Sequence, residues 1–281
     1  MLNLDYEKTL PIIELFNSIE GEGSEAGMPT IFVRMSGCNL RCCFNNSICD
    51  TAYSSFNPEK GKFTYKDVEE IIEKYPLTTN FCISGGEPFL YPEILSNLID
   101  IADSYCMDVM IETNGSIEIE EKLLKKIDIA NISPKLSSSN PTNEKLEKLG
   151  LQWTEALKNH AKSRFNIEAL WKLIEYPEDF RLKYVVGCQS DFKEIEDQIR
   201  ELMDYDIAKK KRTRCPQEFN DEEVWYDGKF INPWNVILMP AGSTNEELNQ
   251  NRKMVAEYCA KRGFCYSDRL QIVIWETERN R

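Results

Sequence analysis

The chain has 281 residues, of which 42% are hydrophobic and 29% charged, and this composition excludes a disordered, collagen-like or coiled-coil protein. Its formal net charge of −13 disfavours nucleic acid and anionic membranes as partners, so a small-molecule substrate is expected. The N-terminus lacks a signal-peptide pattern and no apolar stretch is long enough to span a bilayer, which predicts a cytoplasmic protein.

From residue 30 onward, short β-branched or aromatic runs alternate with longer amphipathic stretches, as in βα units around a parallel sheet. The expected strands span residues 31–36, 80–85, 108–113, 127–133, 181–187, 235–239 and 270–275. Helices are expected over 64–75 and after Ser243, because both stretches begin with a pattern typical of a capping box. These units predict an α/β fold, a partial (β/α)6-type barrel with parallel strands.

The sequence predicts a single domain over residues 1–281. Two polar stretches, near 136–175 and 203–233, are expected to be loop or cap insertions and not linkers between domains. In parallel α/β sheets ligands bind at the carboxyl ends of the strands. The motifs that directly follow the expected strands are therefore the first candidates for function.

Cysteines are concentrated directly after the first of these strands. Four of the ten fall within twelve positions: Cys38, Cys42, Cys43 and Cys49. Thiols stay reduced in the cytosol, so this cluster indicates zinc or iron–sulfur binding and not disulfides. A zinc site usually takes a second ligand pair downstream, and the single histidine, His160, lies far along the sequence from any cysteine pair. A closed four-thiolate zinc site within the loop is the alternative.

The segments GCNLRC and CDT resemble the cysteine motif of radical S-adenosylmethionine (radical SAM) enzymes. In those enzymes three thiolates hold a [4Fe-4S] cluster, whose fourth iron binds the S-adenosylmethionine cofactor. The resemblance implies a radical SAM core with Cys38, Cys42 and Cys49 as ligands. The usual spacing is C-x3-C-x2-C, whereas six residues separate Cys42 from Cys49 here, so Cys43 stays a candidate in place of Cys42.

Three further strand ends carry polar motifs. The strand over 80–85 runs into SGGEP, which resembles the GGEP motif of the same superfamily, and the next two strands end in ETNG and SPK. Glycines let a ligand approach the backbone closely, and Lys135 offers a cation to a carboxylate. Alternatively, each motif is only the end of a strand followed by turn-forming residues. The cofactor-binding residues that the resemblance implies are Asp50, Gly85, Gly86, Glu87, Glu112, Asn114, Ser133, Pro134 and Lys135.

The segments NSIEGEG, GMPT and FVR, together with SPK and the C-terminal Arg269-Leu270-Gln271, resemble the 7-carboxy-7-deazaguanine synthase family. The resemblance implies a lyase that contracts 6-carboxy-5,6,7,8-tetrahydropterin to 7-carboxy-7-deazaguanine with loss of ammonia, in queuosine and 7-deazapurine biosynthesis. It assigns no catalytic residue beyond the cluster and the cofactor, and it implies Mg²⁺ on Thr51. An electron donor such as flavodoxin or ferredoxin and a homodimer are also implied. The substrate-binding residues would be Ile19, Glu20, Gly21, Arg34 and Ser84.

The chain departs from this family at Glu20, where many members have glutamine, and at Ile48, where an aromatic residue is usual. An ionised glutamate only accepts hydrogen bonds, so the first change alters which substrate edge it can face. Two alternatives stay open. One is another radical SAM enzyme, such as an activase that makes a glycyl radical on a partner protein; the other is a structural zinc-binding interaction protein.

Overall fold

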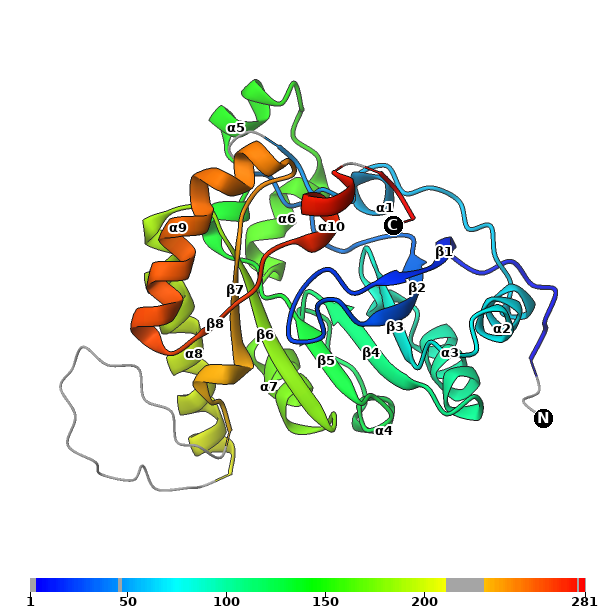
Figure 1. The fold of residues 1–281 in the computed structure, drawn as a ribbon. Coiled ribbons are helices and arrows are strands. Elements are labelled where there is room, and N and C mark those ends of the chain that lie inside the picture. The colour runs from blue at the N-terminus through cyan, green and yellow to red at the C-terminus, as the bar shows by residue number, and fades with distance from the viewer. Residues whose placement is uncertain (1–3, 45–46, 211–229, 277, 281) are drawn as a thin grey trace.

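The computed structural model describes residues 4–44, 47–210, 230–276 and 278–280. One eight-stranded sheet organises them, with its strands side by side in chain order, so that β1 and β8 are its edges (Figure 1). The strands are β1 Ile12–Ile19, β2 Pro29–Met35, β3 Asn80–Gly85, β4 Asp108–Thr113, β5 Ile129–Ile132, β6 Asp179–Val186, β7 Val236–Pro240 and β8 Cys265–Tyr266. β1 is antiparallel to β2, and every other neighbouring pair is parallel.

Helices connect these strands. The α-helices are α1 Ala52–Ser55, α2 Tyr65–Lys74, α3 Pro92–Ser104, α4 Glu121–Leu124, α5 Asn143–Lys148, α6 Glu155–Ser163, α7 Ile167–Glu175, α8 Gln189–Lys209, α9 Asn245–Arg262 and α10 Leu270–Trp275. Short 3-10 helices are η1 Pro88–Leu90, η2 Ser137–Ser139 and η3 Pro233–Asn235. The packing of α3 on β4, α7 on β5 and β6, α8 on β6 and α9 on β7 places helices along the outer face of the sheet (Figure 1).

The expected α/β class with parallel strands is confirmed, and β2 to β7 match six of the expected strands. Strand β1 was not expected, and the expected strand over 270–275 is wrong, because this segment forms helix α10. A short apolar run does not by itself distinguish a strand from a helix. Here β8 pairs with β7, and α10 leaves Val273 and Ile274 39% and 51% exposed.

The two faces of the sheet differ because side chains alternate along each strand. Val33, Ile83 and Ile111 point outward into the main core beneath the helices. On the inner face of β2, Phe32 is followed by Arg34. The next inner pairs are Cys82 then Ser84 on β3, Met110 then Glu112 on β4, and Ile129 then Asn131 on β5. The inner face is thus apolar at its base and polar toward the carboxyl ends of the strands.

Helix starts follow local rules. Thr64 forms the expected capping box with Asp67 at the start of α2. Helix α9 begins one position later than its motif suggested, because Thr244 accepts the Glu247 amide hydrogen as N-cap.

The two expected insertions are partly helical. Helix α7 packs against β5 and β6 as an ordinary βα connection, and the segment between β5 and α7 contains η2, α5 and α6. Helix α8 continues to Lys209, and residues 211–229 of the second insertion lie outside the described residues. In the described ranges, no helix is both long and apolar enough to cross a membrane.

Candidate active site

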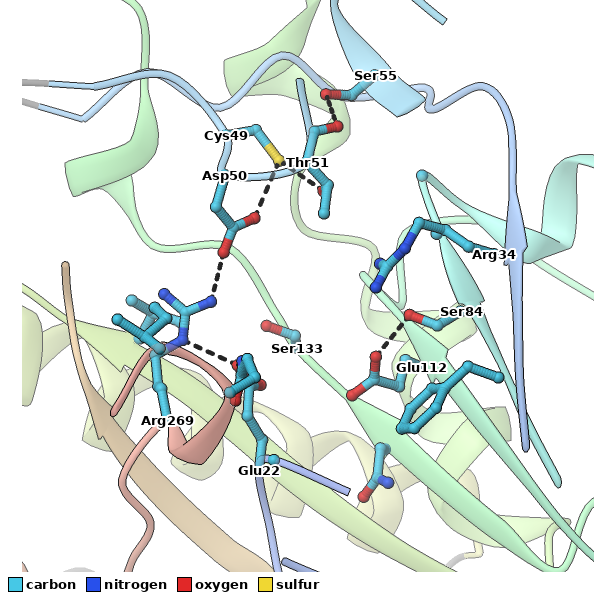
Figure 2. A pocket seen from close by; sticks show the side chains of 18 of the residues that line it. Glu22, Arg34, Cys49, Asp50, Thr51, Ser55, Ser84, Glu112, Ser133 and Arg269 are labelled. Carbon is cyan, nitrogen blue, oxygen red and sulfur yellow. Dashed lines mark hydrogen bonds and ion pairs between the residues drawn. The ribbon is translucent and has the colours of Figure 1, made fainter. Parts of the chain in front are cut away.

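A cavity of about 380 Å³ opens at the carboxyl ends of β2 to β7. The loop after β2, the segment after β1 and the start of α10 close it from the sides (Figure 2). The predicted residues that line it are Ile19, Glu20, Gly21, Arg34, Cys38, Cys42, Cys49, Asp50, Thr51, Ser84, Gly85, Gly86, Glu112, Asn114, Ser133 and Lys135. Cys43, Glu87 and Pro134 are not among the lining residues.

The cysteine loop folds back on itself and brings Cys42 beside Cys49. The Cys49 amide donates to the Cys42 carbonyl at 3.1 Å, and an antiparallel bridge pairs Cys43 with Ile48. Cys43 and Ile48 are thus paired with each other, and neither lines the cavity. Adjacent side chains on such a strand point to opposite sides, so Cys42 faces the cavity while Cys43 packs against Leu146 and Leu157.

The cavity thiols Cys38, Cys42 and Cys49 are free and partly or fully buried. Burial raises the pKa of Cys38 to about 11, and burial also raises the pKa values of Cys42 and Cys49, with the other thiols adding to the effect at Cys42. Lys135 is a nearby cation that opposes the increase at Cys38 and Cys42. A bound metal would favour the thiolate forms instead. Within the described ranges, no three Cys, His, Asp or Glu side chains are already grouped as a metal site.

Charged side chains around the cavity form a connected network, in which Lys183 and Arg269 are buried. Lys183 on β6 lies 3.3 Å from a Glu22 carboxylate oxygen and 2.8 Å from one of Glu112. Arg269 donates to Glu22 at 2.8 Å and also pairs with Asp50 (Figure 2). Arg269 and Lys183 outweigh the burial of Glu22 and lower its pKa, and Lys183 does the same for Glu112. These two carboxylates are thus held ionised.

Glu20 is the exception among these carboxyl groups. Its side chain is 3% exposed, Oε1 accepts the Glu22 amide hydrogen at 3.0 Å, and Oε2 has no hydrogen-bond partner among the described residues. Burial, with the negative charge of Glu112 next, raises the pKa of Glu20 to about 8, although Lys183 opposes the increase. Glu20 therefore carries a proton at neutral pH, and its carboxylic acid can donate a hydrogen bond as an amide does.

Arg34 reaches the cavity from β2 with part of its charge already balanced. Its Nε donates to Glu14 at 2.6 Å, and Tyr53 donates to the same oxygen at 3.1 Å. The guanidinium group points toward Ser84, which donates to Glu112 at 2.5 Å (Figure 2). A planar guanidinium fixed from behind in this way can present its remaining donors to a carboxylate.

Two of the predicted cofactor residues, Glu87 and Asn114, make hydrogen bonds that connect the strand ends beneath the cavity. The buried carboxylate of Glu87 accepts hydrogen bonds from the Thr113 hydroxyl and the Asn114 amide, both at 2.8 Å, which ties β3 to the end of β4. The Asn114 side chain donates to Asn39 in the cysteine loop at 2.9 Å. Glu87 thus connects the ends of β3 and β4, and Asn114 links the strand end to the loop that carries the thiols.

Comparisons with known proteins agree on one family. Residues 19–152 match a family described as a 4Fe-4S single cluster domain. The 7-carboxy-7-deazaguanine synthase of Halobacterium salinarum is 34% identical over 266 residues, covering 95% of this chain and 90% of that protein. The protein of the same name from Rhodopirellula baltica is 32% identical over 266 residues, covering 95% and 86%. The chain belongs to the 7-carboxy-7-deazaguanine synthase family.

The fold of this 7-carboxy-7-deazaguanine synthase family member also resembles a solved structure. QueE from Escherichia coli superposes with a TM-score of 0.57 at 19% identity, covering 93% of this chain and 94% of that one. At this identity the likeness shows the fold alone, and it agrees with the mostly parallel α/β sheet.

Several lining residues of this family member were missed as site residues from the sequence. Among them are Glu22, Asn131, Lys183, Arg269 and Gln271. Asn131 is 1% exposed and neither atom of its amide group has a hydrogen-bond partner in the described part of the chain; the same holds for Gln271 Oε1. A lone polar residue at an inner position of an apolar strand was the available signal for Asn131 and Lys183. The sheet gathers these groups from distant segments.

Proposed function

We propose that this chain is a 7-carboxy-7-deazaguanine synthase, a radical SAM lyase that contracts 6-carboxy-5,6,7,8-tetrahydropterin to 7-carboxy-7-deazaguanine with loss of ammonia. The observation that carries the proposal is that two sets of side chains line the same cavity. One is the thiol wall, made of the free thiols of Cys38, Cys42 and Cys49; the other is the polar wall of Glu20, Asn131 and Gln271, which have polar atoms with no hydrogen-bond partner among the described residues. Relatives of this name that align over nearly their whole length support it. The product would enter queuosine or other 7-deazapurine biosynthesis.

The thiol wall suits an iron–sulfur cluster. We propose Cys38, Cys42 and Cys49 as its ligands, since all three are free and line one cavity while Cys43 faces an apolar cluster. When bound, the cluster and S-adenosylmethionine supply a carbon radical that can take a hydrogen atom from the substrate.

The remaining cofactor contacts are proposed from the strand ends. Gly85 and Gly86 leave backbone groups accessible, and a side chain at Gly86 would collide with the Gly37 carbonyl. Lys135, held by Ser133 at 2.8 Å, provides a cation for the cofactor carboxylate. Thr51 is proposed to bind Mg²⁺ through its hydroxyl group.

The polar wall suits a flat heterocycle with one carboxylate. Arg34 would bind the substrate carboxylate, and the neutral acid of Glu20 with the amides of Asn131 and Gln271 would pair with the ring edge. The ring would rest on the stacked pair of Phe16 and Phe32, whose centroids lie 5.1 Å apart at the apolar base. Buried polar groups that pair only with the correct ligand give strong selectivity against analogues.

Some parts of the proposal rest on the family resemblance alone. These are the bound Mg²⁺, an electron donor such as flavodoxin or ferredoxin, the homodimer and the cytoplasmic location.

Anaerobic reconstitution tests the proposal. The protein would be loaded with iron and sulfide and incubated with 6-carboxytetrahydropterin, S-adenosylmethionine, Mg²⁺ and a strong reductant. We expect 7-carboxy-7-deazaguanine by mass spectrometry, lost on Cys38→Ala and retained on Cys43→Ala as the matched control. A brown protein that cleaves the cofactor without this product would point to another radical SAM reaction, such as glycyl-radical activation. A colourless zinc protein would overturn the proposal.

A further inference from the structure

The segment between β5 and α7 is bound to the outer side of the cysteine loop. Lys145 on α5 donates from its ammonium group to the carbonyls of Cys43, Ser138 and Asn140 at 2.9, 2.6 and 2.9 Å. The Cys43 amide in turn donates to the Ser139 carbonyl at 2.8 Å. A single lysine therefore joins the backbone of the loop to the backbone of the segment after β5.

His160 on α6 makes a second attachment. It is fully buried, and its Nδ1 accepts the Arg41 amide hydrogen at 3.1 Å. Nδ1 must then be unprotonated, so Nε2 carries the hydrogen and donates to the Ser139 hydroxyl at 3.1 Å; that hydroxyl donates to the Leu136 carbonyl. Burial, with the cations of Arg164, Lys135 and Lys145, lowers the pKa of His160 to about 4 and keeps the ring neutral.

The residue that His160 holds lies between two of the proposed ligands. Arg41 directly precedes Cys42, and its guanidinium donates to the carbonyls of Cys38 and Leu40 at 2.7 and 2.8 Å. Arg41 thus fixes the loop backbone on the side of Cys38, while its own amide is fixed by His160. Cys43 also packs against Leu146 of α5 and Leu157 of α6, so the loop contacts both helices through apolar side chains as well.

We propose that α5 and α6 form a clamp that positions the cluster-binding loop, with His160 acting through the Arg41 amide and Lys145 through the Cys43 carbonyl as its positioning residues. The inference rests on the proposed function, because it assigns cluster binding to this loop.

The physical reason for such a clamp is the length of the loop. Six residues separate Cys42 from Cys49, and each additional residue that must be ordered costs conformational entropy. Contacts from α5 and α6 hold the loop in place before iron arrives, and they also slow the loop's departure once the cluster is bound.

Two substitutions at one position separate the contacts of His160. In His160→Asn the side-chain oxygen can replace Nδ1 and keep the Arg41 hydrogen bond, whereas His160→Gln places its amide near the position of Nε2 and keeps the Ser139 bond instead. His160→Ala removes both, and Lys145→Met removes the ammonium donors while keeping most of the side-chain volume. Lys158→Ala is the matched control, since its ion pair with Glu155 is exposed on the same helix.

Cluster retention and loop exchange are the measurements. Anaerobic loss of cluster absorbance to an iron chelator would be followed in each reconstituted variant. Amide hydrogen exchange of the peptide spanning 38–44 would be followed in the metal-free protein. We expect about tenfold faster cluster loss and exchange in the Gln variant, which loses one buried hydrogen bond to the loop, and at least as large an increase in the Ala and Met variants, which lose more than one. The Asn variant and the control should stay within about twofold of wild type.

The outcomes are distinguishable. Equal rates in all variants would overturn the clamp. Equally fast loss in His160→Asn and His160→Gln, with equal falls in melting temperature, would show that His160 only fills space and would overturn its assignment. If the wild-type protein binds no iron, the proposed function fails; the exchange experiment still decides whether α5 and α6 order the loop.

Discussion

The protonated state of Glu20 leads to a stability difference that depends on pH. The group's ordinary pKa is 4.5, and in the folded protein it is about 8. Below pH 4.5 both the folded and the unfolded chain bind this proton. Between 4.5 and 8 only the folded chain keeps it, so this group lowers the free energy of unfolding progressively as pH rises, and the effect is complete above pH 8.

Replacing the acid with an amide, Glu20→Gln, removes this dependence while keeping the shape and the donor. At about 1.4 kcal/mol per pH unit, the shift sets an upper bound of about 5 kcal/mol on the gain in the substituted protein above pH 8. Rearrangement around an ionised Glu20 should reduce the gain to about 2–3 kcal/mol, or a rise of about 5–10 °C in melting temperature. Near pH 5 the two proteins should differ little.

Urea unfolding of the metal-free, reduced proteins between about pH 5 and pH 9 measures this difference directly. Glu201→Gln on α8 is the control, because it is the same acid-to-amide change at an exposed position and should change the free energy of unfolding by about 0.5 kcal/mol or less. A flat difference for Glu20→Gln as well would refute the assignment of a protonated Glu20. Enzyme activity should fall above pH 8 in the wild type only, because the ionised acid no longer donates to the substrate.

Other predictions concern the loop, the floor and the buried charges. Cys42→Ala should lower bound iron after reconstitution to near zero, whereas Cys43→Ala should keep it and cost about 1 kcal/mol in urea unfolding through lost packing. Gly86→Ala should destabilise the protein by about 2 kcal/mol and abolish S-adenosylmethionine binding in equilibrium dialysis, since its Cβ would lie 1.9 Å from a backbone oxygen. Lys183→Met should cost about 3–5 kcal/mol near pH 8 and less near pH 5, where Glu112 can take up a proton; an equal cost at both pH values would contradict the network.

Local spacing was enough to predict much of the fold. The strand positions of β2 to β7 and the capping box at Thr64 depend on side-chain alternation and on contacts within one turn, which a sequence displays directly. The same holds for the placement of the cysteines after β2, because the carboxyl ends of parallel strands share one edge of the sheet. The order of the motifs also indicated the family, which the relatives confirm.

Other features depend on which surfaces meet in the folded chain. From the sequence, residues 270–275 were predicted to form a strand. In the folded chain β8 pairs with β7, and residues 270–275 form helix α10, whose Leu270 amide donates to the Gly21 carbonyl. His160 is far from the cysteines in sequence, yet α6 brings its ring to the Arg41 amide.

The protonation state of Glu20 could not be predicted from the sequence for the same reason. Its pKa depends on burial and on the charges of Glu22, Glu112 and Lys183, which come from three separate segments. Electrostatic interactions and burial act through space. The sequence therefore shows which side chains can carry a charge, whereas the packing of the sheet determines which of them are charged in the folded protein.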